Sequence, residues 1–140
     1  MAFPDGPVFV DSGPLIALVD RGDPLHREAR GFFGREGSRL LTHVGVVGEA
    51  VTFVRYRFGH APARRLGDHV RAGRALTLLP IELTDDLDGW RWFLRYRDQK
   101  FSLVDCWSFA VMTRLGIRDV ATFDDDFAIA GFTPVFAARS

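Results

Sequence analysis

The chain has 140 residues, 47% of them hydrophobic, which is enough for one domain with a substantial core and too few for two. Eighteen basic residues balance eighteen acidic ones, so net charge alone does not point to a nucleic-acid partner. The single cysteine, Cys106, has no partner, and the four histidines show no zinc-ligand spacing. We therefore expect residues 1–140 to form a single domain without disulfides or structural zinc.

The first apolar stretch, residues 7–19, has neither the composition of a signal peptide nor that of a membrane span. Asp11, Ser12, Gly13 and Pro14 interrupt it, and the only nearby basic residue, Arg21, comes afterwards. No other segment approaches the length of a transmembrane helix. We therefore expect a cytoplasmic protein with no membrane partner.

The first predicted elements are a strand and two helices. A buried strand is predicted at residues 8–10, and Pro14 suits the first position of a helix over residues 15–19. Asp23-Pro24 begins a second helix in the same way, and that helix is expected to stop near residues 34–37.

The middle of the chain continues the alternation of strands and helices. A second strand is predicted at residues 39–42 and a long helix at residues 44–58, which Gly59 closes as a C-terminal cap. Pro62 begins a further helix that ends at Gly73. Within the long helix, Gly45 and Gly48 lower helix stability and predict the close approach of a neighbouring group.

The third predicted strand, residues 76–81, leads to Thr84, whose hydroxyl can cap a helix with two aspartates in its first turn. Ser102 opens another helix, which ends at Gly116. A fourth strand at residues 120–123 follows.

The last predicted elements are a short turn of helix from Asp126 and a strand at residues 135–136, which Pro134 suits to a sheet edge. Strands that alternate with amphipathic helices predict an α/β fold. We expect an α/β/α sandwich with a mostly parallel central sheet covered on both faces.

Acidic residues occupy the positions where open α/β sheets bind ligands, at or near the carboxyl ends of strands. Asp11 follows the first strand and Asp124 the fourth, while Glu49 and Asp105 lie early in predicted helices. In the run of three aspartates, Asp124 is nearest to the strand and Asp126 is the second candidate; Asp125 is expected to point to solvent.

Each acid also has an ordinary structural explanation. Asp11 could be a turn residue before a helix, and Glu49 could be a half-buried, hydrogen-bonded side chain in an apolar helix start. Asp105 fits the third position of a capping box that begins at Ser102. The run beginning at Asp124 could cap the short helix that follows it.

Four converging carboxylates would repel one another, so such a cluster makes physical sense mainly around cations. Ligand sets made only of oxygen select hard ions, here Mg²⁺ or Mn²⁺. With a phosphodiester substrate, these ions can activate water and neutralise charge on the attacking and leaving oxygens, so no protein nucleophile is needed.

Residues 55–74 carry six arginines opposed only by Asp68. This charge could follow an RNA backbone or could simply solvate exposed helix faces. We take Arg55, Arg64 and Arg65 as candidate RNA contacts.

Four motifs in this order resemble the PIN-domain family, and most closely its toxin branch, the VapC ribonucleases of bacterial toxin–antitoxin pairs. The motifs are Val10-Asp11-Ser12, the helical Glu49, Leu103-Val104-Asp105-Cys106 and Thr122-Phe123-Asp124-Asp125-Asp126-Phe127. The resemblance covers nearly the whole chain. It departs from the family at Gly13-Pro14, where the family commonly has a small polar residue and a helix former. It also departs at Asp125, where the family often has a basic or polar residue.

The resemblance implies that Asp11, Glu49, Asp105 and Asp124 are catalytic metal ligands, and that the Ser12 and Thr122 hydroxyls brace the site. It further implies a metal-dependent endoribonuclease that cuts tRNA or ribosomal RNA, acts as a homodimer, and is inhibited by a small cognate antitoxin.

Two alternatives are a catalytically silent PIN-like scaffold that binds RNA or protein, and an aspartate-based phosphotransfer domain. A haloacid dehalogenase phosphatase needs a second aspartate two residues after the first, where this chain has Gly13. A response-regulator receiver expects a lysine after a late strand, whereas the only lysine, Lys100, precedes Ser102.

Overall fold

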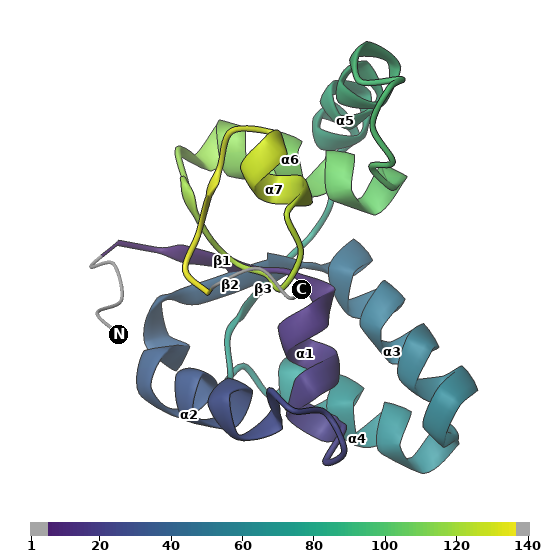
Figure 1. Ribbon diagram of the computed structural model, residues 1–140, viewed down its shortest axis with the longest axis vertical. Coiled ribbons are helices and arrows are strands. Elements are labelled where there is room, and N and C mark those ends of the chain that lie inside the picture. Colours follow the sequence, from purple (N-terminus) through teal and green to yellow (C-terminus); the bar gives the residue numbers. More distant parts are fainter. Residues whose placement is uncertain (1–5, 137–140) are drawn as a thin grey trace.

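The computed structural model describes residues 6–136, which form a five-stranded sheet between two layers of helices (Figure 1). The strands lie in the order β3-β2-β1-β4-β5, and all four pairings are parallel. The strand bounds are β1 (Val8–Val10), β2 (Leu40–His43), β3 (Thr77–Leu79), β4 (Asp119–Ala121) and β5 (Thr133–Pro134). The predicted α/β fold with a mostly parallel sheet is confirmed.

Seven α-helices in this part of the chain cover the two faces of the sheet (Figure 1). One face carries α1 (Ser12–Val19), α2 (His26–Glu36), α3 (Val44–Phe58) and α4 (His60–Arg71). The other carries α5 (Leu83–Arg95), α6 (Leu103–Leu115) and α7 (Asp126–Ile129). A 3₁₀-helix, η1 (Gly37–Arg39), joins α2 to β2. None of the helices within residues 6–136 combines the length and apolarity needed to cross a bilayer.

The core lies on both sides of the central strand β1, whose three residues are fully buried. On the side of α6, Phe109 packs edge-on against Phe101 and Phe127 and stacks on Phe132. Because strands β1 and β4 are held between packed layers, their carboxyl ends form a fixed platform for the side chains that follow.

Two helices begin earlier than their prolines predicted. α1 begins at Ser12 and α4 at His60, so Pro14 and Pro62 each occupy the third helical position instead of the first. Proline is tolerated throughout a first turn because the N–H groups there have no acceptor within the helix.

Two other helix starts differ because a side chain closes the preceding turn. Asp23 Oδ1 accepts the Leu25 N–H at 2.8 Å, and α2 begins only at His26. Glu82, and not Thr84, caps α5, where it forms a capping box with Asp85.

Several of the other predicted elements match closely. The prediction for α3 is confirmed at both ends, as is the capping of α6 by Ser102. Strand β3 is shorter than predicted, and β4 ends at Ala121 instead of residue 123. The last strand lies two residues earlier than predicted, at the sheet edge as expected.

Candidate active site

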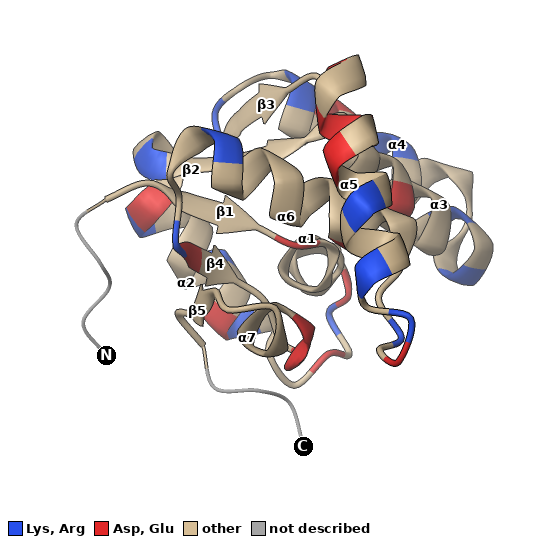
Figure 2. Cartoon of the chain, turned by 90° about the horizontal axis from the view of Figure 1, so that it is seen from above, with Lys and Arg blue, Asp and Glu red and all other residues tan. Residues whose placement is uncertain are grey.

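The strand order makes the ends of β1 and β4 the topological switch point of the sheet. Because β1 has β2 on one side and β4 on the other, successive crossovers leave β1 in opposite directions, and ligands bind at such a switch point in open α/β sheets. The Asp11 N–H donates to the Ala121 carbonyl at 2.9 Å and fastens the two strand ends together. Acidic segments follow the end of β1 and precede α7 on this side of the molecule (Figure 2).

Asp11 is the most strongly perturbed acid of the site. It is only 5% exposed, and its Oδ2 accepts the hydroxyl of the buried Thr122 at 2.9 Å. Its pKa is raised to about 7, mainly by burial and also by the charges of Asp105 and Asp124, while hydrogen bonds from Ser12 and Thr122 oppose the rise. A positive charge beside Asp11 would relieve this cost.

Asp105 is both a helix-capping residue and a member of the acidic cluster, the two roles that its position in the sequence allows. Its Oδ2 accepts the Ser102 N–H at 3.0 Å, and its own N–H donates to Ser102 Oγ at 3.0 Å, which completes a capping box. Burial nevertheless raises its pKa to about 6, helped by the charges of Asp126 and Asp124. A capping role therefore does not remove Asp105 from the acidic cluster, because one carboxylate oxygen suffices for the cap.

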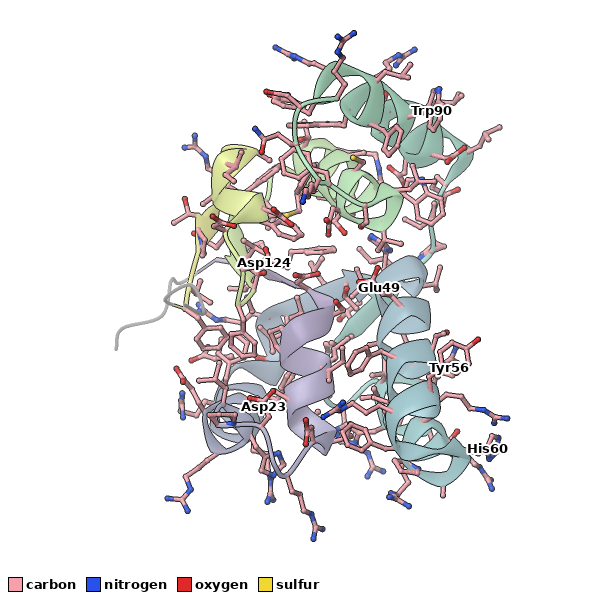
Figure 3. The ribbon with its side chains drawn as sticks, turned by 45° about the vertical axis from the view of Figure 1, so that its right-hand side comes forward. Asp23, Glu49, Tyr56, His60, Trp90 and Asp124 are labelled. Carbon is pink, nitrogen blue, oxygen red and sulfur yellow. The ribbon has the colours of Figure 1, made fainter. Side chains whose placement is uncertain are left out.

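Glu49 reaches the site through Ser12. Its Oε1 accepts the Ser12 hydroxyl at 2.9 Å, which joins α3 to the first turn of α1. The side chain is exposed, so the half-buried position considered from the sequence is wrong; the hydrogen bond to it is present. Glu49 and Asp124 lie on either side of the start of α1 (Figure 3).

The three aspartates before α7 divide their roles. Asp124 Oδ1 accepts the Asp126 N–H at 3.0 Å, so Asp124 stabilises the turn, and its own N–H donates to Thr122 Oγ1 at 3.4 Å. The charge of Asp124 raises the pKa values of Asp11, Asp105 and Asp126. Asp126 is half-buried and acts on Asp105, while Asp125 is exposed as expected. Asp124 is thus the loop acid whose charge acts on both Asp11 and Asp105.

His43 caps α3, the helix that carries Glu49, and the sequence alone did not reveal this role. It is fully buried at the end of β2, and its Nδ1 accepts the N–H groups of Gly45 and Val46 at 3.0 and 3.3 Å, which caps α3. Nε2 must then carry the proton and donate to Ser108 Oγ, 2.9 Å away. Burial lowers the His43 pKa to about 4, so the ring is neutral near pH 7. A histidine between a strand and a helix, with glycine two residues later, is the signal that could have revealed this cap.

The close approach predicted at the two glycines of α3 occurs at only one of them. A Cβ on Gly45 would lie 2.9 Å from His43 Cε1 and 3.0 Å from Trp107 Cε3, so this position requires glycine. At Gly48 a Cβ would have no neighbour within 4 Å. The requirement at Gly45 is therefore one of packing.

The chemistry of the site suits a hard divalent cation. Asp11, Glu49, Asp105 and Asp124 offer only oxygen donors, and within residues 6–136 none of them forms an ion pair with lysine or arginine. In the same range, no three His, Cys, Asp or Glu side chains are already gathered closely enough to enclose a metal ion. Carboxylates that repel one another are expected to stand apart until a cation draws them together.

The arginines proposed as RNA contacts separate into two groups. Arg55 and Arg64 line a groove between α3 and α4, whereas Arg65 lines a different groove bounded by α1, α2 and α4. Consecutive helical residues point about 100° apart, so two neighbours in sequence can serve different surfaces.

Comparisons with known proteins agree on one family. The PIN domain family model matches residues 8–132. The 23S rRNA-specific endonuclease VapC20 of Mycobacterium tuberculosis is 35% identical over 131 residues, which cover 91% of this chain and 97% of that protein.

Solved structures give the same answer. The crystal structure of Mycobacterium tuberculosis VapC20, described as a sarcin-ricin loop cleaving toxin, matches with a TM-score of 0.83 and 30% identity over 90% of this chain and 96% of that one. FitAcB from Neisseria gonorrhoeae has the same fold, with a TM-score of 0.62 and 17% identity over 91% and 95% of the two chains.

Proposed function

The chain belongs to the PIN-domain family, and from this we propose that it is a metal-dependent endoribonuclease, the toxin of a toxin–antitoxin pair. The observation that carries the proposal is the acidic cluster itself. At the switch point of the sheet, the charges of Asp105 and Asp124 raise the pKa of Asp11, and the charge of Asp124 raises that of Asp105. None of the three has a cationic partner among the described residues. A nucleic-acid hydrolase of this kind uses such acids to hold metal and needs no side-chain nucleophile.

In this proposal Asp11, Glu49, Asp105 and Asp124 hold Mg²⁺ or Mn²⁺, with Asp126 as the alternative to Asp124. When bound there, such an ion would activate a water molecule and neutralise charge on the scissile phosphate. The protein keeps the ligands in place: Thr122 orients Asp11, Ser12 orients Glu49, and the capping hydrogen bonds of α6 fix Asp105.

Ribosomal RNA is the substrate we favour over tRNA. The relative that is 35% identical over nearly the full length of both chains is named for cleavage of 23S rRNA. Because VapC20 is described as a sarcin-ricin loop cleaving toxin, the sarcin-ricin loop of 23S rRNA is the first substrate to test.

A small acidic antitoxin is the partner we propose for the groove bounded by α1, α2 and α4. This groove, of about 420 Å³, has an apolar floor that includes Leu18, Val19 and Leu66. Basic side chains stand around that floor: Arg21, His26, Arg30, Arg65 and His69. The combination is complementary to an amphipathic segment with acidic side chains.

We also propose a homodimer formed through the outer face of α5. Five large apolar side chains on this helix are 40–73% exposed: Leu83, Leu87, Trp90, Phe93 and Leu94. Trp90 and Phe93 stack on each other with ring centroids 5.1 Å apart. Contiguous exposed apolar side chains of this size are typical of an interface. Light scattering should give twice the monomer mass for the wild type and the monomer mass for Leu87→Asp.

The two alternatives fare differently. Receiver domains have the strand order 2-1-3-4-5, and the observed order 3-2-1-4-5 contradicts that assignment. The phosphatase alternative still lacks its second aspartate, because Gly13 occupies that position. A catalytically silent PIN-like scaffold would share this fold and site, so only an assay of RNA cleavage separates it from a nuclease.

The test is cleavage of 23S rRNA by the purified protein, free of antitoxin, in Mg²⁺ or Mn²⁺ and in EDTA. We expect metal-dependent cleavage that Asp11→Asn and Asp105→Asn abolish while remaining folded, because the asparagine oxygen can still accept the hydrogen bonds described above. Asp125→Asn is the matched control. It removes an exposed acid whose side chain takes no part in these hydrogen bonds, so this variant should retain activity. RNA binding without cleavage by the wild type would establish the scaffold instead.

A further inference from the structure

A second candidate surface for RNA lies outside the acidic cluster, in the groove between α3 and α4. The groove has a volume of about 610 Å³, within the range of ligand sites in proteins. The polar and aromatic side chains that line it include Arg55, Tyr56, His60, Arg64, Asp68 and Arg71. Tyr56 and His60 are labelled on this part of the molecule in Figure 3.

The charge of this groove is positive. Three arginines line it against a single acid, Asp68. Asp68 pairs with Arg64 at 3.4 Å, but the two side chains are 69% and 74% exposed, so water screens the pair and leaves Arg64 available. Arg71 Nη1 donates to the Gly67 carbonyl at 3.3 Å, which holds its guanidinium against α4. An anionic ligand is the electrostatic complement of this surface.

Tyr56 adds an unusual feature to the groove. It is 85% exposed, the largest exposed fraction among the large hydrophobic side chains of the described residues. An aromatic ring between arginines is the combination that binds single-stranded nucleic acid, in which the ring stacks on a base and the arginines contact phosphates.

The groove is aligned with the acidic cluster. Tyr56 lies seven residues after Glu49 on α3, which is two helical turns and about 10 Å along the same face. Thr52 lies between them and also lines the groove. A strand whose phosphate sits at the carboxylates could therefore continue along this face of α3 into the groove (Figure 3).

An RNA strand fits the groove better than an acidic protein segment does. The apolar side chains that line it are small, Val51 and Ala63, so an amphipathic helix would find little to bury. The groove that contains Arg65 has the larger aliphatic floor described above, which suits a protein partner.

We propose that the α3–α4 groove binds a single-stranded stretch of the RNA substrate next to the scissile bond. Arg55, Arg64 and Arg71 contact its phosphates, and Tyr56 stacks on a base. The inference rests on the proposed nuclease function for the identity of the ligand, and it excludes Arg65 from RNA binding.

The test measures binding of a synthetic RNA hairpin with the sarcin-ricin loop sequence by fluorescence anisotropy at several salt concentrations. The uncleaving variant Asp11→Asn is the background. Replacing Arg55, Arg64 and Arg71 by alanine should weaken binding and reduce the slope of log K against log salt by about 2, since each phosphate contact on a single strand contributes about 0.7. Arg65→Ala is the matched control and should leave the slope unchanged.

Tyr56 provides an independent measurement. Tyr56→Ala should weaken binding by about 5-fold or more with an unchanged salt slope, and Tyr56→Phe should restore it, because stacking needs the ring and not the hydroxyl. Thermal melts of each variant verify folding. In the active background the same changes should raise KM more than they lower kcat, as expected for loss of substrate binding.

The outcomes separate this inference from the proposed function. Suppose that the wild type shows metal-dependent cleavage and that the salt slope of the triple variant is unchanged. This result would overturn RNA binding in the α3–α4 groove and leave the proposed nuclease function standing. A slope reduced by about 0.7 in Arg65→Ala, the same loss per arginine as in the triple variant, would also overturn RNA binding in the groove, because general surface charge would then explain the binding. If the wild type binds RNA through this groove but never cleaves it, RNA binding in the groove is upheld and the proposed nuclease function is overturned.

Discussion

Replacing Asp11 by asparagine should change how stability depends on pH in metal-free protein. The pKa of Asp11 is raised from 3.8 to about 7, so the folded state holds a proton that the unfolded state has already released. Between pH 4 and pH 7 the folded state therefore binds more protons, and the free energy of unfolding falls as pH rises. Below pH 4 both states are protonated and this contribution to stability is fully present.

The size of the effect follows from the shift. The rise in the Asp11 pKa from 3.8 to about 7 corresponds to about 4 kcal/mol in the free energy of unfolding, at roughly 1.4 kcal/mol for each pKa unit. Domains of this kind are typically stable by only about 5–15 kcal/mol, so the loss is a large share of the total. Asp11→Asn carries no charge at any pH, and its amide oxygen can still accept the Thr122 hydroxyl, so it should escape this loss.

Urea unfolding of wild type and variant in EDTA, from pH 4 to pH 8, provides the measurement. His43 acts in the opposite direction, because burial lowers its pKa from 6.5 to about 4 and stability due to it is lost as pH falls through that range. His43 is present in both proteins, so it cancels in the difference between them. We expect that difference to grow by about 4 kcal/mol in favour of the variant as pH rises from 4 to 8. A difference that does not change with pH would refute the buried, charge-coupled Asp11 described above.

Three further predictions concern the metal, the brace on Asp11 and the α5–α6 pair. Mn²⁺ in excess should raise the melting temperature of the wild type at pH 8 but not that of Asp11→Asn. At a Mn²⁺ concentration of 100 times Kd, the free energy of unfolding should increase by about 2.7 kcal/mol. Equal melting curves of the wild type with and without metal would contradict the proposed ligands. Thr122→Val should move the fall in stability to higher pH, because the Thr122 hydrogen bond lowers the Asp11 pKa, and Thr122→Ser should move it back. Asp85→Ala should lower the free energy of unfolding in urea by about 2–3 kcal/mol, because buried Asp85 accepts two hydrogen bonds from Arg114, of 2.7 and 3.0 Å. A decrease below about 0.5 kcal/mol would show that the pair contributes little.

The strand pattern and the acids at strand ends could be recognised from the sequence because both are local features. Val8, Phe9 and Val10 form an uninterrupted apolar run, as a central parallel strand requires, and Asp11 follows it directly. Parallel strands bring their carboxyl ends to one edge, so Asp124 was expected near Asp11 without knowledge of the packing. The capping box of α6 was equally visible, since Ser102 and Asp105 are three residues apart.

Contacts between distant segments could not be derived in the same way. Nothing near Glu49 in the sequence indicates that Ser12, 37 residues earlier, donates to it, or that Glu49 remains exposed. The cap on α5 was assigned to Thr84 because its hydroxyl suits that role, but the turn after β3 places Glu82 there instead. The buried state of His43 depends on Ser108, which belongs to a helix on the other face of the sheet.

Arg64 and Arg65 show the same limit at the surface. The sequence identifies a basic segment, and composition treats its members as equal. Their side chains diverge by about 100° around α4, and the helices packed on either side decide that Arg64 meets α3 while Arg65 meets α1 and α2. The residue types and their spacing along the chain were sufficient for the fold and the family. The division of the basic segment between two grooves depends on long-range packing, because a groove exists only between helices that the chain brings together from separate segments.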